Sequence, residues 1–275
     1  MPYESHPYVS EPNGDAAIWR FMDMGKFRDL MANQELYFRR ADRFAKDPNE
    51  GVPPEEWLRA TLKLRQFVLE DEVRLNHEKG TLAQFREASY VTCWYLYTHE
   101  DPEMWREFAP YGVAVCSRYD FLKEALNSVV DPAHMGLTRY GYQPTDPYNL
   151  TQFIYTKGTE FSREQEVRVV ITCNDPVAGN NRHIGPTNFP HERPLKANRL
   201  HKWVHDGKRR RINLKPVVNG VVVSPWASDK VCREVEDWVR FTNMTCGATR
   251  SGLRSKCFPS PKQRANVLSN SPPRG

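Results

Sequence analysis

The sequence lacks the cysteine spacings that mark zinc ribbons and disulfide scaffolds. Its six cysteines are scattered, and no two of them are separated by only two residues: Cys93, Cys116, Cys173, Cys232, Cys246 and Cys257. A zinc ribbon needs closely spaced cysteine pairs, and small secreted disulfide proteins are much richer in cysteine. The absence of such pairs argues against both classes, and we expect the cysteines that lie in apolar patterns to be buried thiols.

Long hydrophobic runs are also missing. No apolar stretch approaches the roughly 20 residues that a membrane-spanning helix needs, and the N-terminal MPYESHPYVSEPNGD has no apolar signal-peptide core. The chain has 275 residues, of which 39% are hydrophobic and 12% aromatic, so it is long enough to bury a sizeable core. We therefore expect a globular, cytoplasmic protein that does not act at a membrane.

Acidic residues are absent from the end of the chain. The last residues contain six basic side chains and no acid: Arg250, Arg254, Lys256, Lys262, Arg264 and Arg274. Without these six charges the formal net charge of +5 falls to −1. The rest of the chain is thus nearly neutral, which does not describe a domain that coats nucleic acid with a generally basic surface.

The pattern of elements predicts one α+β domain over residues 17–253, with a bent or split, mainly antiparallel sheet flanked by helices. Residues 1–16 are expected to form a flexible lead-in, residues 175–198 a long surface loop, and residues 254–275, rich in Pro and Ser, a disordered basic tail. Strands are predicted within 17–23, 35–44, 89–96, 112–117, 137–142, 166–172, 212–224 and 245–253. Helices are predicted over 25–34, 55–79, 101–108, 119–130 and 229–241, with Gly80 ending the longest.

The stretch FIYTKGTEFSREQEVRVVIT, residues 153–172, combines a strand pattern with closely spaced charges. Its apolar face would carry Val167, Val169 and Ile171. If the extended conformation begins by Glu164, the other face carries Glu164, Glu166 and Arg168. Two carboxylates at this spacing would lie within roughly 7 Å and feel each other's charge. They are either ion-pair partners of the arginine or a pair of catalytic acids.

Four blocks of the sequence together resemble a bacterial family known as domain of unknown function 2971. They are IWRFMDMGKFRDLMANQELYFRRADRFAKDPNEG, TCWYLYTHEDPEMWREFAPYGVAVCSRYDFLKEAL, FIYTKGTEFSREQEVRVVI and GVVVSPWASDKVCREVEDWV. The resemblance spans about residues 18–253 and departs where the family often has a Lys-Arg pair, which is Thr156-Lys157 here. The family name implies no activity.

Three shorter pieces resemble ADP-ribosyltransferases, which share an Arg or His on an early strand, a Ser/Thr-bearing strand and a late Glu-any-Glu motif. The matching residues are Arg20, Thr92 and Glu164-Gln165-Glu166. The resemblance implies that NAD is the substrate, that no metal is needed, and that the acceptor is an unknown macromolecule. It also implies a setting in bacterial defence or toxin systems. Breaking the nicotinamide–ribose bond leaves positive charge on the sugar, which a carboxylate stabilises.

The resemblance implies a role for each residue of this candidate site. Glu166 would stabilise the transition state, Glu164 would orient or deprotonate the nucleophile, and Thr92 would fix Glu166 by a hydrogen bond. Arg20 and Arg168 would bind the anionic dinucleotide. Trp94 or Tyr95 would stack on its nicotinamide ring.

Other interpretations of the same residues stay open. The charged residues of the 153–172 stretch are also consistent with plain ion pairs and the aromatic ones with core packing, in a protein that catalyses nothing. A nucleic-acid-binding or nucleic-acid-processing protein would use the basic cluster within residues 199–211, with Trp203 for stacking, and the C-terminal tail. If that protein were a nuclease, Glu50, Glu164 and Glu166 would serve as its metal-binding carboxylates. A separate metal site would use His201 with His205.

Overall fold

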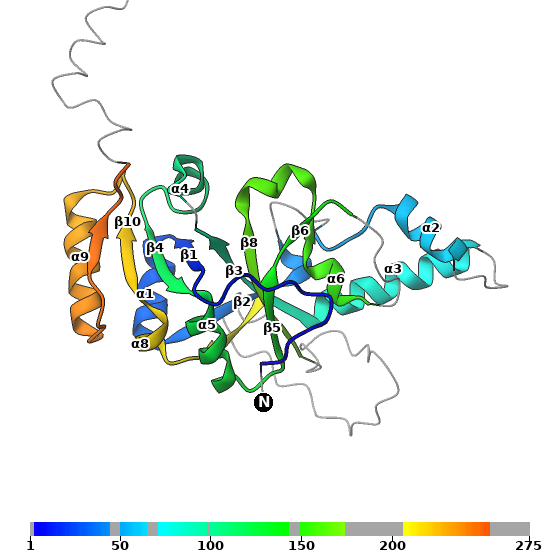
Figure 1. Ribbon diagram of the computed structural model, residues 1–275, viewed down its shortest axis with the longest axis horizontal. Helices are drawn as coiled ribbons and strands as arrows, with labels where there is room; N and C mark the ends of the chain where they lie inside the picture. The colour runs from blue at the N-terminus through cyan, green and yellow to red at the C-terminus, as the bar shows by residue number, and fades with distance from the viewer. Residues whose placement is uncertain are drawn as a thin grey trace, which may run out of the picture.

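The computed structural model describes residues 3–44, 50–64, 71–97, 99–142, 149–173 and 206–253, and it has an α+β fold (Figure 1). Within these ranges, none of the helices combines the length and the apolar character needed to cross a bilayer. The α+β class and the mainly antiparallel sheet predicted from the sequence are confirmed. The predicted loop at 175–198 and tail at 254–275 lie outside the described residues.

The helices are α1 (Met24–Asn33), α2 (Glu55–Leu64), α3 (Asp71–Ala88), α4 (Pro102–Phe108), α5 (Tyr119–Ala125), α6 (Thr151–Ile154), α8 (Leu214–Val217) and α9 (Asp229–Phe241). Three 3-10 turns accompany them: η1 (Ala41–Arg43), η2 (Leu126–Ser128) and η3 (Thr159–Glu164). The strands of the main sheet are β1 (Ala17–Met22), β2 (Glu35–Arg40), β3 (Ser89–Leu96), β4 (Val113–Arg118), β5 (Ala133–Leu137), β8 (Glu166–Thr172), β9 (Gly207–Arg211), β10 (Gly220–Val223) and β11 (Ala248–Arg250). Two short parallel strands, β6 (Arg139–Tyr140) and β7 (Thr156–Lys157), form a separate pair.

Strand β3 organises the sheet because it has three neighbours. Along one edge it pairs with β8 over nearly its whole length, from Ser89↔Thr172 to Tyr95↔Glu166. Its other edge pairs with β2 near its start and with β1 at its end. From this edge β1 continues through β4 and β10 to β11, whereas β2 continues to β9. A split therefore opens between β1 and β2 along this edge, but the strands still form one 9-stranded sheet. The predicted alternative of a main sheet divided into two is not what the structure has.

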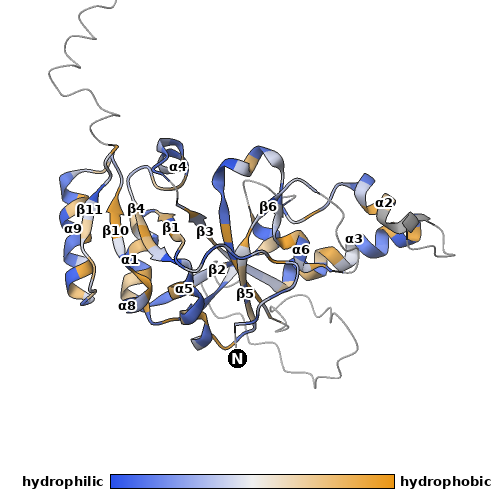
Figure 2. Cartoon of the chain, viewed as in Figure 1, coloured by the Kyte–Doolittle hydropathy of each residue, from blue (hydrophilic) through white to orange (hydrophobic). Residues whose placement is uncertain are grey.

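The two faces of the sheet have different surroundings. Residues directly opposite each other in antiparallel strands lie on the same face, so Val167, Val169 and Ile171 share a face with Thr92 and Trp94. This is the face of the principal core, to which α1, α5, α8 and α9 contribute buried residues. Helix α9 alternates orange and blue in Figure 2, as expected for an amphipathic helix. The predicted apolar face of β8 is confirmed, because its three residues are fully buried.

Capping side chains explain where several helices begin. The Asp101 carboxylate accepts a hydrogen bond from the backbone N–H of Glu103 at the start of α4, with Pro102 as the first helical residue. Ser228 caps α9 in the same way through the N–H of Val231. The predicted Asp101 cap is confirmed.

Several predicted elements differ from the structure. Gly80 does not end a helix, because α3 continues through it to Ala88, and packing of Leu75 and Leu82 into one cluster outweighs its low helix propensity. Residues 214–217, predicted within a strand, form the short helix α8, which Asn213 caps. The lead-in runs beside β5, where Leu137 N–H donates to the Ser10 carbonyl oxygen at 2.7 Å.

The central position of β8 gives a stability prediction. Ile171 is fully buried between β3 and β5, so Ile171→Ala should lower the free energy of unfolding by about 2–5 kcal/mol. The control is Val73→Ala, because Val73 is 57% exposed and its truncation should cost less than about 0.5 kcal/mol. Urea denaturation of both variants checks this. Equal effects would contradict the assigned core.

Candidate functional site: a buried charge cluster

The segment before β8 does not have the expected geometry. Residues 159–164 form the 3-10 turn η3, and Gln165 has a φ of 43°, in the left-handed region. The strand therefore begins at Glu166, and the prediction of one extended run from Glu164 to Arg168 is wrong. The turn nevertheless brings the Glu164 carboxylate back toward Glu166, because both carboxylates contact Lys157 on the neighbouring β7.

Arg168 is fully buried and holds two carboxylates. Its Nε donates to Glu166 Oε1 at 2.9 Å and its Nη2 to Glu166 Oε2 at 3.3 Å. Nη2 also donates to Glu50 Oε1, and Nη1 donates to the backbone oxygen of Ile154 at the end of α6. Arg168 and Glu166 are each 1% exposed. A guanidinium at this depth has to be neutralised and hydrogen-bonded, and these contacts do both.

Lys157 is the second buried cation and contacts the same acids. Its Nζ lies 2.7 Å from Glu164 Oε2, 3.1 Å from Glu166 Oε2 and 3.9 Å from Glu50 Oε1. The ring of Phe161 also contacts it, with 4.7 Å between Nζ and the ring centroid. We call these five ionisable residues the charge cluster: Glu50, Lys157, Glu164, Glu166 and Arg168.

The cluster holds three carboxylates and two cations, and burial and charge shift the pKa values of Glu166 and Lys157. Burial raises the pKa of Glu166, although the Lys157 ammonium opposes the shift. Burial alone would lower the pKa of Lys157, but the charges of Glu166 and Glu164 raise it above its ordinary value. Burial, together with the nearby Glu166 charge, raises the pKa of Cys93 on β3 well above its usual range. Cys93 is therefore a neutral thiol and not a thiolate nucleophile.

The strand register separates the predicted site residues into two sets. Tyr95 lies directly opposite Glu166 on the face of the charge cluster. Thr92 and Trp94 lie opposite Val169 and Val167, on the other face. The prediction that Thr92 fixes Glu166 by a hydrogen bond is therefore wrong, and within the described part of the chain the buried Thr92 hydroxyl has no hydrogen-bond partner.

Trp94 belongs to the principal core. It is 1% exposed and packs among the apolar residues beneath the helices. The prediction that it stacks on a nicotinamide ring is wrong because no ligand reaches that position without displacing the core. Tyr95 is the predicted aromatic residue that does lie on the face of the carboxylates. It is 9% exposed, and its ring packs against Phe21 and Phe108.

Arg20 occupies the split between β1 and β2. Its Nη2 donates to the Tyr37 carbonyl oxygen at 3.2 Å, and its Cζ lies 5.9 Å from the centroid of the Trp94 ring. Burial lowers the pKa of Arg20 to about 10, although Cys93 and Tyr95 act in the opposite direction. Among the described residues no carboxylate lies within ion-pair distance of its guanidinium. Arg20 is thus a partly buried cation on the Trp94 face of the sheet, because its neighbour Trp19 is the residue that lies opposite Tyr95. It makes no contact with Glu166 or Glu164, so the strand register separates the predicted dinucleotide-binding arginine from the two acids.

Arg168 has a different role from the one predicted. The resemblance placed it among the cofactor-binding residues, but its guanidinium is occupied by Glu166, Glu50 and the Ile154 oxygen. The prediction of a cofactor-binding Arg168 is therefore wrong, and the residue instead neutralises the cluster.

The predicted metal site of Glu50, Glu164 and Glu166 falls within the same cluster. The three carboxylates do converge, but they surround an ammonium and a guanidinium. Among the described residues no group of three or more His, Cys, Asp or Glu side chains is placed to hold a metal ion. His201 and His205 lie outside the described residues.

The basic cluster predicted for nucleic acid is described only from Asp206 onward, so Trp203 falls outside. Two of its arginines are already neutralised by acids within the fold. Arg209 pairs with Asp29, and Arg210 pairs with Asp131. Ion pairs of this kind leave fewer free cations for phosphate groups.

Sequence reasoning missed Lys157 and Glu50 as members of one ion-paired site. Lys157 lies in a two-residue strand, and Glu50 follows the sequence AKDPN, so neither has a periodic pattern. Cys93 could have been found, because it precedes Tyr95 by two residues on a strand and therefore shares its face. No protein-family model, curated protein or solved structure matches the chain significantly.

Removing a buried cation from the cluster should be costly. Arg168→Met leaves three carboxylates around Lys157 alone, so we expect a loss of about 3–5 kcal/mol in the free energy of unfolding. Arg163→Met is the matched control, because the Arg163 side chain is 49% exposed and its ion pair should be worth about 0–1 kcal/mol. Urea denaturation separates the two. Similar losses in both variants would contradict the cluster's structural role.

The raised pKa of Lys157 predicts how stability depends on pH. The folded state keeps a proton that the unfolded state releases as the pH rises above the ordinary lysine value of 10.5. The stabilisation is therefore complete below this pH and is lost as the pH rises through the folded pKa. Lys157→Arg stays protonated, so its stability should fall less steeply above pH 10.5 when unfolding is followed at a series of pH values. Parallel curves for both proteins would refute this.

Proposed function

We propose that the chain is an ADP-ribosyltransferase-like enzyme that uses NAD as its substrate. One observation carries the proposal: the carboxylates of Glu164 and Glu166 meet at the ammonium of Lys157, on the face of the sheet that bears Tyr95. Two carboxylates held beside an aromatic ring suit a reaction that develops positive charge on a sugar. The acceptor is a macromolecule or, in its absence, water.

Glu164 and Glu166 differ in burial, and this difference suggests different roles. The Glu164 side chain is 11% exposed, whereas that of Glu166 is 1% exposed and bound by both cations. We therefore assign the catalytic role to Glu164. Glu166 and Lys157 become positioning residues, because Lys157 holds the Glu164 carboxylate in place through a 2.7 Å hydrogen bond.

The proposed reaction replaces one bond at the ribose C1′ atom. The bond between C1′ and the nicotinamide nitrogen breaks, and its electron pair neutralises the positive charge of the nicotinamide ring. The oxygen or nitrogen of the acceptor forms the new bond to C1′. Glu164 takes the proton that the acceptor loses and stabilises the positive charge that develops on the ribose. The ring of Tyr95 offers a stacking surface for the departing nicotinamide.

We assign no part in NAD binding to Arg20. The strand register places Trp19 opposite Tyr95, so Arg20 lies on the other face of the sheet, beside Trp94 and away from Glu166.

The test is release of nicotinamide from NAD by the purified protein. Glu164→Gln keeps the size of the side chain but removes its charge, so the rate should fall at least about 100-fold. Glu160→Gln is the matched control, because Glu160 lies in the same turn and is exposed; its rate should equal that of the wild type. Thermal unfolding should show that both variants are folded.

Two results would refute the proposal. The first is that the folded wild-type protein turns over no NAD under any condition. This result would rule out the enzyme assignment. The second is a Glu164→Gln variant that turns over NAD at the wild-type rate, and it removes Glu164 from the chemistry.

A further inference from the structure

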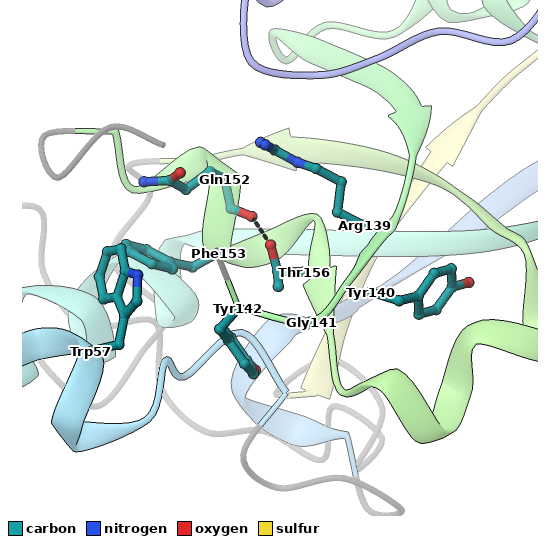
Figure 3. A pocket seen from close by; sticks show the side chains of 8 residues that line it. All are labelled: Trp57, Arg139, Tyr140, Gly141, Tyr142, Gln152, Phe153 and Thr156. Carbon is teal, nitrogen blue, oxygen red and sulfur yellow. Dashed lines mark hydrogen bonds between the residues drawn. The ribbon is translucent and has the colours of Figure 1, made fainter. Parts of the chain in front are cut away.

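A cavity of about 250 Å³ lies beside β6 and β7 (Figure 3). Its lining comes from α2, α6, the two short strands and the turn after β6: Trp57, Arg139, Tyr140, Gly141, Tyr142, Gln152, Phe153 and Thr156. Tyr140 connects this region to the charge cluster, because its hydroxyl accepts a hydrogen bond from the Glu166 N–H at 2.7 Å. Figure 3 shows its ring turned away from the other lining side chains, and no member of the charge cluster lines the cavity.

The walls of the cavity are aromatic and its floor is buried. Phe153 and Thr156 are buried, whereas Trp57 and Tyr142 are partly exposed at the rim. The rings of Trp57 and Phe153 meet edge to face, with 5.0 Å between centroids and an angle of 82°. Figure 3 shows Tyr142 across the space from this pair. Flat aromatic walls on two sides suit a planar ring.

Arg139 adds a positive charge beside the cavity, and Figure 3 shows its guanidinium beyond Gln152 and Thr156 as seen from Tyr142. Its Nη2 donates to the Tyr8 carbonyl oxygen at 2.9 Å, and no carboxylate among the described residues pairs with it. Lys157, on the adjacent strand, contacts three carboxylates. A guanidinium with remaining N–H donors and no counter-charge favours an anionic group on the ligand.

The size of the cavity limits the ligand. A cavity of about 150 Å³ is enough to hold benzene, and sites for drug-sized molecules start at about 300 Å³. The space therefore fits a single ring system, and the rest of a larger ligand, such as the ribose phosphate of a nucleotide, would extend beyond the rim. The Thr156 hydroxyl is already committed to the Gln152 carbonyl oxygen at 2.7 Å, so recognition of charge falls to Arg139.

We propose that this cavity binds a planar aromatic ring that bears one anionic group. The ring inserts between Trp57, Phe153 and Tyr142, and the anionic group pairs with Arg139. A mononucleotide and a small aromatic carboxylic acid both have this chemistry. The site does not depend on the proposed enzymatic function, because its lining includes neither Glu164 nor Glu166.

The test is titration of the full chain with adenosine monophosphate and with benzoate, followed by ligand-observed NMR. One of the two should bind at least about tenfold more tightly than its uncharged counterpart, adenosine or benzamide, because a charge-assisted hydrogen bond is worth a factor of this size. Preference for the monophosphate identifies a nucleotide site, and preference for benzoate identifies a site for aromatic acids.

Variants test whether Arg139 recognises the anionic group. Arg139→Gln should weaken binding of the anionic ligand about tenfold and leave binding of the uncharged counterpart unchanged. Arg233→Gln, an exposed change on α9, should bind like the wild type, and so should Glu164→Gln even if NAD is not turned over. The proposal is overturned if neither anionic ligand binds, or if Arg139→Gln binds it as tightly as the wild type.

Discussion

Burial of Arg168 in the middle of β8 is the constraint that the candidate site depends on. The side chain is 1% exposed and lies on a strand that has neighbours on both edges. A guanidinium cannot be left unpaired at that depth, so Glu166, Glu50 and the Ile154 carbonyl oxygen are all brought to it. The Arg168 guanidinium thereby contacts the segment before α2, the end of α6 and the start of β8. The same constraint explains the position of Glu164, the more exposed acid. Glu166 contacts both Arg168 and Lys157, and Lys157 also holds the Glu164 carboxylate at the edge of the cluster.

The sequence predicts local structure well wherever one pattern decides it. Alternation in 166–172 predicted the buried face of β8, and Asp101 with Pro102 predicted the start of α4. The prediction from Gly80 was wrong because tertiary packing outweighs helix propensity in α3. Glu164 lies close to Glu166, as predicted, but on a 3-10 turn and not on the strand. A strand pattern does not reveal that Gln165 adopts a left-handed conformation.

The site was harder to predict than the fold because its members come from distant segments. Thr92 and Glu166 are both on strands, but the face that each presents depends on the β3–β8 register, which the sequence does not state. Glu50 has no local pattern at all and pairs with Arg168 from 118 positions away. Long-range ion pairs of this kind follow from the fold and leave no local pattern in the chain.

The most direct measurement of the central claim is a double-mutant cycle between Glu166 and Arg168. Unfolding free energies are measured for Glu166→Gln, Arg168→Met and the double variant. If burial of the guanidinium is what requires the carboxylate, the double variant should be less destabilised than the sum of the single variants by about 1–3 kcal/mol. Additive effects, within about 0.5 kcal/mol, would show that the two residues are stabilised independently and would contradict the account.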